Sequence, residues 1–169
     1  MKRFKIIILS FYLLLISIVP SLGAGSDGDL LKVDWSFKGL TGKFDRSSLQ
    51  RGFQVYKEVC SSCHSMQYLS YRNLGEPGGP EFSEQEVKAI AASIEIDDGP
   101  DSQGEMFTRP GRPADKFKSP YPNVNASIAA NGGAYPPDMS VLVKARPGGS
   151  NYIYSVSMVY EDPPTGMNL

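Results

Sequence analysis

The sequence predicts a mainly α-helical domain with extensive coil. Three observations indicate this class. The length of 169 residues suits one domain, apolar residues recur at helical spacing in several segments, and 17 Gly and 13 Pro keep those segments short. So few short helices rarely form a core by themselves, and we therefore expect a large ligand to complete it.

Residues 1–24 have the pattern of a secretory signal peptide. Three basic residues precede an almost unbroken apolar run over 6–19, and Pro20 and small residues follow it. The run is shorter than the ~20 residues of a membrane helix, although an uncleaved anchor stays an alternative. Either form exports residues 25–169, for which we predict a single domain. Removing residues 1–24 changes the formal net charge from −1 to −4.

The elements of the first half follow from apolar spacing and capping signals. Residues 25–44 are irregular and predict an extended arm. A capping box at Ser47 predicts a first helix that runs to Cys60. A second capping box at Ser83 predicts another helix, which Gly and Pro end at 97–100.

Loops and short helices make up the second half. Residues 75–80 predict a loop and residues 99–124 a long ordered loop or a linker. We expect a short helix over 125–130, closed by Asn and two Gly residues. Asp138 is predicted to cap a further short helix that ends at residue 145. Residues 151–160 fit a helix, although their β-branched residues also allow a strand.

Composition excludes several functions. The negative net charge argues against nucleic-acid binding. One His and two Cys leave too few ligands for a site with two histidines or for a four-Cys zinc or iron–sulfur site.

The run Cys60-Ser61-Ser62-Cys63-His64 is the c-type haem attachment pattern. On a helical turn, thiols three residues apart lie on one side, where each can form a thioether with a haem vinyl group. The next residue then presents its imidazole to the iron. Because these five residues hold every Cys and His of the chain, the pattern predicts one covalent haem c with His64 as an axial ligand.

Three other interpretations of this run are weaker. A thioredoxin-type redox pair requires a βαβ setting, whereas a helix is predicted before Cys60. A disulfide between Cys60 and Cys63 would close a very small loop and add little stability. A zinc site would lack a fourth ligand.

The second axial ligand is left open by the residues themselves. The only His is already used, so the iron takes a Met or keeps an open position. Met66 lies too close to the attachment turn, and Met106, Met139, Met158 and Met167 are formal candidates. A Met ligand raises the reduction potential and suits electron transfer, whereas an open position suits ligand binding or peroxidase chemistry.

The sequence resembles the cytochrome c1 family, the haem-bearing subunit of the cytochrome bc1 complex (ubiquinol–cytochrome c reductase). The resemblance runs from about Trp35 to the end of the sequence. The segments that carry it are LQRGFQVYKEVC at 49–60, RPGRPAD at 109–115, PYPN at 120–123, AANGGAYPPD at 129–138, KAR at 144–146 and YEDPPTG at 160–166.

The resemblance implies further haem contacts. Asn131, Pro136 and Pro137 would line the haem pocket, and Arg146 and Tyr152 would contact the haem propionates. Arg offers a bidentate fork to a carboxylate and Tyr a hydroxyl donor. Without the resemblance, a solvated surface charge and a core aromatic would be the ordinary interpretations of these last two residues.

One departure from the family concerns the end of the sequence. The family's iron-binding Met and its C-terminal membrane helix lie beyond the Pro-Pro-Thr-Gly segment, and this sequence ends at Leu169 before either. We therefore expect a fragment whose sixth-ligand Met and membrane helix lie beyond Leu169. A complete chain would lack the usual sixth ligand and have a lowered reduction potential.

Charge is distributed unevenly along the chain. Residues 81–105 carry eight acidic residues against one Lys, a net charge of −7, and residues 109–146 carry a net charge of +4. An acidic surface steers a basic partner and speeds association at low salt. The family's acceptor is a soluble cytochrome c, and part of 95–105 is predicted to dock it. The ordinary interpretation of any single acidic residue here is that it lies on a solvated loop or helix face.

These patterns together predict an electron carrier. The resemblance implies transfer from a Rieske iron–sulfur protein to soluble cytochrome c, beside cytochrome b in the respiratory bc1 complex. The location implied is the periplasmic side of the bacterial inner membrane or the intermembrane-space side in mitochondria. No catalytic residue is expected, since the complex rather than this subunit is the oxidoreductase. The alternatives are a peroxidase-type or ligand-binding haem protein with an open iron site, and a haem sensor or storage module.

Overall fold

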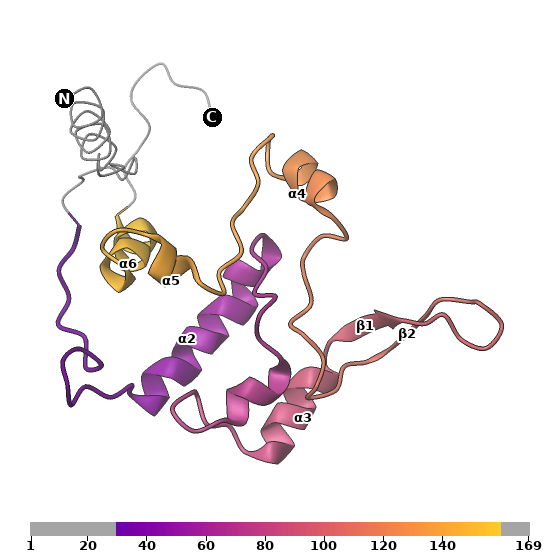
Figure 1. The fold of residues 1–169 in the computed structure, drawn as a ribbon, viewed down its shortest axis with the longest axis horizontal. Helices are drawn as coiled ribbons and strands as arrows, with labels where there is room; N and C mark the ends of the chain where they lie inside the picture. The colour runs from indigo at the N-terminus through magenta and orange to yellow at the C-terminus, as the bar shows by residue number, and fades with distance from the viewer. Residues whose placement is uncertain (1–29, 160–169) are drawn as a thin grey trace, which may run out of the picture.

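The computed structural model describes residues 30–159, and the predicted signal peptide lies outside them. Short helices and long coil segments make up most of this part (Figure 1), so the predicted class is confirmed. The helical elements are α2 (Arg46–Glu58), η1 (Cys60–Ser62), η2 (Tyr71–Gly75), α3 (Glu84–Ala92), α4 (Val124–Ala130), α5 (Leu142–Ala145) and α6 (Ser150–Met158). The strands β1 (Glu95–Asp98) and β2 (Phe107–Pro110) form a two-stranded sheet.

Helix α2 begins earlier than the sequence predicts. Asp45 has extended backbone and is the N-cap, since its side chain accepts a 2.7 Å hydrogen bond from the Ser48 backbone N–H. The prediction of a cap at Ser47 was therefore wrong, because an Asp three residues before Ser48 satisfies the first turn. The helix ends at Glu58, directly before the attachment turn.

Helix α3 confirms the second capping box. The Ser83 side chain accepts from the Glu86 backbone, and the Glu86 carboxylate accepts from the Ser83 N–H at 2.8 Å. The helix ends at Ala92 rather than at residue 97, so Ile94 follows it as part of the connection to β1.

The hairpin β1–β2 corrects two predictions. Residues 95–98 are a strand rather than the end of a helix, and β2 interrupts the predicted loop over 99–124. The strands pair antiparallel with Ile96 opposite Arg109. Figure 1 shows the hairpin projecting from the rest of the described chain. Four-residue strands give little alternation, and Arg109 of β2 adds hydrogen bonds to Asp98 of β1 and to Asp115.

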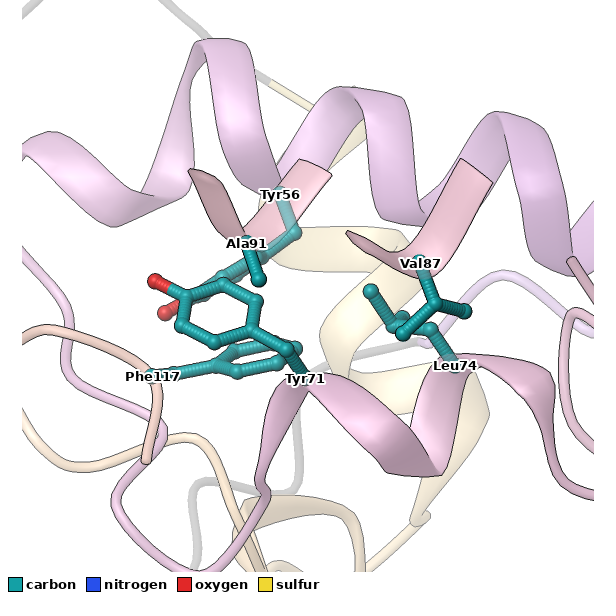
Figure 2. Packing of buried hydrophobic residues seen from close by; sticks show 6 residues of the cluster. All are labelled: Tyr56, Tyr71, Leu74, Val87, Ala91 and Phe117. Carbon is teal, nitrogen blue, oxygen red and sulfur yellow. The ribbon is translucent and has the colours of Figure 1, made fainter. Parts of the chain in front are cut away.

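The buried core is small and lies against one face of α2. Figure 2 shows its six side chains, of which Tyr71 and Phe117 lie in a tilted arrangement with ring centroids 4.8 Å apart. The set comes from α2, η2, α3 and one coil segment, and comprises Tyr56, Tyr71, Leu74, Val87, Ala91 and Phe117. Val55 and Val59 are 54% and 64% exposed. An apolar face at the end of α2 is thus left uncovered.

The predicted N-terminal arm packs on α6. The Trp35 indole donates a 2.7 Å hydrogen bond to Oδ1 of Asn151, and the Leu31 N–H donates to Oγ of Ser155 at 2.9 Å. Trp35 also meets the ring of Tyr154 edge-on at a centroid distance of 5.7 Å. These contacts fix the side of α6 that faces the arm.

The last helices confirm one predicted end and correct one predicted cap. The left-handed backbone of Gly132 and Gly133 follows α4, as predicted. Asp138 does not cap α5, which Val141 precedes without a side-chain cap. Residues 150–158 form helix α6, so the alternative of a strand there was wrong. Among the helices of residues 30–159, none has the length and apolarity to cross a bilayer.

Candidate haem-binding site

The attachment turn follows directly from the end of α2. The 3₁₀ turn η1 contains Cys60, and the backbone N–H of His64 donates to the Cys60 carbonyl at 2.8 Å. The Cys63 N–H donates to the same carbonyl at 3.2 Å. Cys60 and Cys63 are free thiols and both are half-buried. The turn therefore presents two thiols and one imidazole within five residues.

The turn borders a largely apolar hollow of about 640 Å³. This size falls in the range of about 300–1,000 Å³ typical of ligand sites. Residues at the uncovered end of α2 and residues of α6 both line it. The lining residues are Val55, Val59, Cys60, Ser62, Cys63, His64, Pro137, Met139, Leu142, Arg146, Tyr152, Ile153, Val156 and Ser157.

Six of the eight predicted site residues come together here. Cys60, Cys63 and His64 meet the later segments that contribute Pro137, Arg146 and Tyr152. The guanidinium carbon of Arg146 lies 6.0 Å from the centroid of the Tyr152 ring. This pair places a cation and a phenol at the hollow, a donor set that suits carboxylates.

The other two predicted residues lie elsewhere. Asn131 ends helix α4, and its side-chain amide donates to the Ser127 carbonyl at 2.7 Å. Pro136 lines a separate hollow of about 170 Å³, to which Cys63 also contributes. Of these two residues, Pro136 thus shares a hollow with Cys63 of the attachment turn, whereas Asn131 does not.

The imidazole of His64 is oriented by a distant carbonyl. Its Nδ1 lies 2.8 Å from the backbone oxygen of Pro137, which is 73 residues further along the chain. A carbonyl can only accept, so Nδ1 is the donor in this hydrogen bond and Nε2 is the ring nitrogen left to bind a metal. A metal-binding His commonly donates its other N–H in this way. The residues present therefore fit an iron porphyrin with His64 as its axial ligand.

The sequence did not predict that the Asp138 side chain holds the segment of the Pro137 carbonyl in place. Asp138 accepts hydrogen bonds from the Ser65 hydroxyl at 2.7 Å, the Gln67 N–H at 2.9 Å and the Ser140 N–H at 2.9 Å. Burial opposes its ionisation, yet these hydrogen bonds lower the pKa of Asp138. The Met139 N–H also donates to the Ser65 carbonyl at 2.8 Å. No local signal could reveal this role, because Ser65 lies far away in the sequence.

Methionine positions separate the candidates for a second axial ligand. Met139 lines the hollow, and Met66 packs against the core. Met106 and Met158 are 66% and 60% exposed. Met167 lies outside the described residues. Met139 is two residues from Pro137, whose carbonyl contacts Nδ1 of His64. The backbone of Met139 therefore belongs to the segment on the Nδ1 side of the ring.

The other interpretations of the Cys-Ser-Ser-Cys-His run find no support in the geometry. Cys60 follows a helix and an extended arm rather than a strand. Cys60 and Cys63 are not joined in a disulfide. Within residues 30–159, no three His, Cys, Asp or Glu side chains are grouped closely enough to hold a metal ion.

One buried phenol lies behind the turn. Tyr56 packs on Phe117, and its hydroxyl donates a long, 3.5 Å hydrogen bond to the His64 carbonyl. Burial, followed by smaller effects of Tyr71, Asp138 and Cys60, raises the pKa of Tyr56 to about 12. The phenol therefore stays neutral at physiological pH.

Comparison with known proteins gives a family match over most of the chain. The model of the Cytochrome C1 family matches residues 35–169. Cytochrome c1 of Rhodospirillum rubrum is 56% identical over 137 residues, which cover 81% of this chain and 49% of that protein. The heme protein cytochrome c1-2 of Solanum tuberosum mitochondria is 51% identical over 135 residues, covering 80% of this chain and 51% of the relative.

A third relative is named as part of a complex. The mitochondrial cytochrome b-c1 complex catalytic subunit of Candida albicans is 48% identical over 137 residues, covering 80% of this chain and 46% of the relative. This chain therefore spans about half the length of these relatives.

Proposed function

This chain belongs to the cytochrome c1 family, and from that premise we propose that it is an exported electron carrier with one covalent haem c. Its domain is a c-type cytochrome haem-binding domain built mainly from helices and coil. The observation that carries the proposal is the shared hollow, which two free thiols and an oriented imidazole line together with apolar side chains of α6.

Named residues would hold the cofactor. The Cys60 and Cys63 thiols would attach it, and His64 would bind its iron through Nε2. Arg146 and Tyr152 would contact its propionates, and Pro137 would line the pocket, with Asn131 and Pro136 further from the attachment turn. The valine and isoleucine side chains of α2 and α6 would exclude water from the ring. When bound, the haem supplies an iron that changes its oxidation state by one electron. The sixth ligand proposed is a Met beyond Leu169.

The proposed route runs through the cytochrome bc1 complex. The protein would accept one electron from a Rieske iron–sulfur protein beside cytochrome b and pass one electron to soluble cytochrome c. The proposed place is the periplasmic side of the bacterial inner membrane or the intermembrane-space side in mitochondria. Membrane attachment would come from a C-terminal helix beyond the present sequence. No bond is made or broken, so no catalytic residue is required.

The acidic residues of the β1–β2 hairpin support the docking of a basic acceptor. Asp98 pairs with Arg109, and Asp97 lies 3.5 Å from the Lys118 ammonium. Within residues 30–159, no basic side chain forms an ion pair with Glu95, Asp101 or Glu105, and all three are exposed. These three carboxylates are therefore available to steer a cationic protein.

One experiment tests the cofactor. The chain is produced in a host that ligates haem to exported proteins, denatured and extracted with acidified acetone. We expect the red pigment to stay with the polypeptide and to give a c-type pyridine haemochrome spectrum. Pigment that leaves with the solvent would refute covalent attachment.

A second experiment tests the proposed use of the haem. Reduced protein is mixed with a basic soluble cytochrome c at rising salt concentration, and oxidation is followed by absorbance. We expect the rate to fall steeply with salt and to fall less steeply for a Glu95→Gln, Asp101→Asn, Glu105→Gln variant. A rate independent of salt argues against this docking surface, and rapid peroxide turnover by the same protein would favour a peroxidase.

A further inference from the structure

We propose that Asp138 is a positioning residue: it holds the Pro137 carbonyl against the His64 ring and so sets the orientation and donor strength of that ligand. The inference deepens the proposed function, because it assumes that His64 binds the haem iron. Asp138 itself does not touch His64 and acts through its neighbour Pro137.

The contacts around Asp138 join two segments that are distant in sequence. One segment follows His64 and contributes the Ser65 hydroxyl and the Gln67 N–H, at 2.7 and 2.9 Å from Oδ2 of Asp138. The other segment follows Pro137, and its Ser140 N–H donates to Oδ1 at 2.9 Å. Oδ2 of the carboxylate thus ties the two segments together, and Oδ1 fixes the local turn of its own segment.

Two further hydrogen bonds from backbone N–H groups join the same two segments. The Met139 N–H donates to the Ser65 carbonyl at 2.8 Å, and the Tyr68 N–H donates to the Ser140 hydroxyl at 3.1 Å. We call these contacts, together with those of Asp138, the Asp138 clamp. The His64–Pro137 hydrogen bond lies at one end of the clamp. Separation of the two segments would therefore lengthen that bond.

The chemistry of Asp138 suits this position. Hydrogen bonds to an ionised acceptor are roughly twice as strong as those between neutral groups. Pro137 adds rigidity, since its ring fixes the backbone next to the carbonyl that His64 contacts. Hydrogen bonding at the second nitrogen of a metal-binding His raises its basicity and fixes its tautomer. The clamp would thus act on the iron through a proton that stays on Nδ1.

The test measures that proton directly. In oxidised holoprotein, NMR gives the rate at which the Nδ1 proton of His64 exchanges with water. We expect Asp138→Ala to raise this rate by about tenfold or more, with Ser65→Ala having a smaller effect in the same direction. Asp138→Asn keeps one acceptor oxygen and should fall between wild type and Asp138→Ala. A rate unchanged in Asp138→Ala would overturn the proposal.

Controls separate positioning from charge and from stability. Asp34→Asn removes an exposed negative charge, and Ser93→Ala removes a hydroxyl that donates to the Ile90 carbonyl in α3. Both should leave the exchange rate near the wild-type value. If Asp138→Ala does not fold, Ser65→Ala decides by the same criterion, because it removes one hydroxyl only. A variant that lowers the midpoint of thermal unfolding while the Nδ1 exchange rate stays unchanged shows a merely structural role.

The same measurement distinguishes the two proposals. If the wild-type protein holds no covalent haem, the proposed function fails. The Nδ1 proton is then observed in the haem-free chain by nitrogen–proton NMR. Slow exchange in wild type and fast exchange in Asp138→Ala would support the Asp138 clamp even then, and equal rates would overturn it.

Discussion

Arg109 holds Asp115 in a bidentate pair, with its Nη1 and Nη2 atoms 2.7 and 2.9 Å from the two carboxylate oxygens. Its Nε atom contacts Asp98 of strand β1, so one guanidinium joins the hairpin to the chain before Phe117. The Asp115 carbonyl also accepts from the Tyr71 N–H at 3.1 Å, which connects this ion pair to the core. The hydrogen bonds from Arg109, opposed by burial, lower the pKa of Asp115 to about 2.

Asp115→Asn should weaken the fold and change its response to acid. A carboxyl with a lowered pKa stabilises the fold above its unfolded pKa near 3.8, and this contribution is lost as the pH falls towards 2. We expect the free energy of unfolding at pH 7 to fall by about 1 kcal/mol, a value discounted for partial exposure. Denaturant titrations at pH 7, 4 and 2 measure it.

The same pH series with a control variant can refute this prediction for Asp115. The difference between wild type and Asp115→Asn should shrink as the pH falls from 4 to 2. The exposed Asp34→Asn variant should show no such difference at any pH. An equal loss for both variants would mean that the pair with Arg109 contributes nothing specific.

Tyr56→Phe should protect the fold at alkaline pH. The pKa of Tyr56 is raised from 10.0 to about 12 chiefly by burial, so the folded state keeps a proton that the unfolded state loses in this window. Stability therefore falls as the pH rises from 10 to 12, by about 1–3 kcal/mol. The variant keeps the ring and should lose less, measured as unfolding free energies at pH 9 and 11.

Two other tyrosines serve as comparisons for Tyr56. Burial also raises the pKa of Tyr71, so some alkaline loss should remain in Tyr56→Phe. Tyr68 is 69% exposed, and Tyr68→Phe should match wild type. If Tyr56→Phe loses as much stability as wild type, the phenol at position 56 is not the group that titrates.

Single thiol removal should leave the haem on one bond. In Cys60→Ala or Cys63→Ala, one thioether remains, and we expect the pyridine haemochrome band to move to a longer wavelength. The double variant should release all pigment into acidified acetone. Ser61→Ala, between the two thiols, is the matched control and should behave as wild type. Retention of pigment by the double variant would place the attachment elsewhere.

Asn151→Ala should release the N-terminal arm from α6. The Oδ1 atom of Asn151 accepts from the Trp35 indole at 2.7 Å and from the Val33 N–H at 3.4 Å. Losing both bonds should cost about 1–2 kcal/mol of unfolding free energy. Trp35 is the single Trp, and its fluorescence in haem-loaded protein should increase as it moves away from the quenching haem.

An isosteric variant tests the cause of that effect. Asn151→Asp keeps an acceptor oxygen at the same place, so it should preserve most of the Trp35 quenching. Fluorescence that increases equally in both variants would show that the amide acts by some means other than accepting these two bonds.

Local signals were sufficient for part of the fold. The capping box at Ser83 was found because both partners lie within one helical turn, and the Gly pair after α4 directly shows its end. The hairpin was missed because its strands are only four residues long and three of the four residues of β1 are acidic, a composition that is rare in strands. Arg109 of β2 adds ion pairs with Asp98 and Asp115 to the backbone pairing.

The candidate site also has a part that the sequence predicted and a part that it did not. The attachment run is contiguous, so residues alone identified Cys60, Cys63 and His64. Arg146 and Tyr152 came from the resemblance to a family, and the structure places both at the hollow. Asp138 was predicted as a helix cap because that is the local preference of Asp. Its actual partner Ser65 lies 73 residues away, where only the folded chain can bring it.

The bonds that hold the two ends of the domain together impose an order on biosynthesis. The hydrogen bond from Leu31 to Ser155 spans 124 residues, and that from Trp35 to Asn151 spans 116. Closing such long loops is slow, and neither can close before the ribosome has delivered α6. The thiols at 60 and 63 leave the ribosome far earlier. If the chain is exported and carries a covalent haem as proposed, attachment could therefore begin on an open chain, before α6 packs against the N-terminal arm.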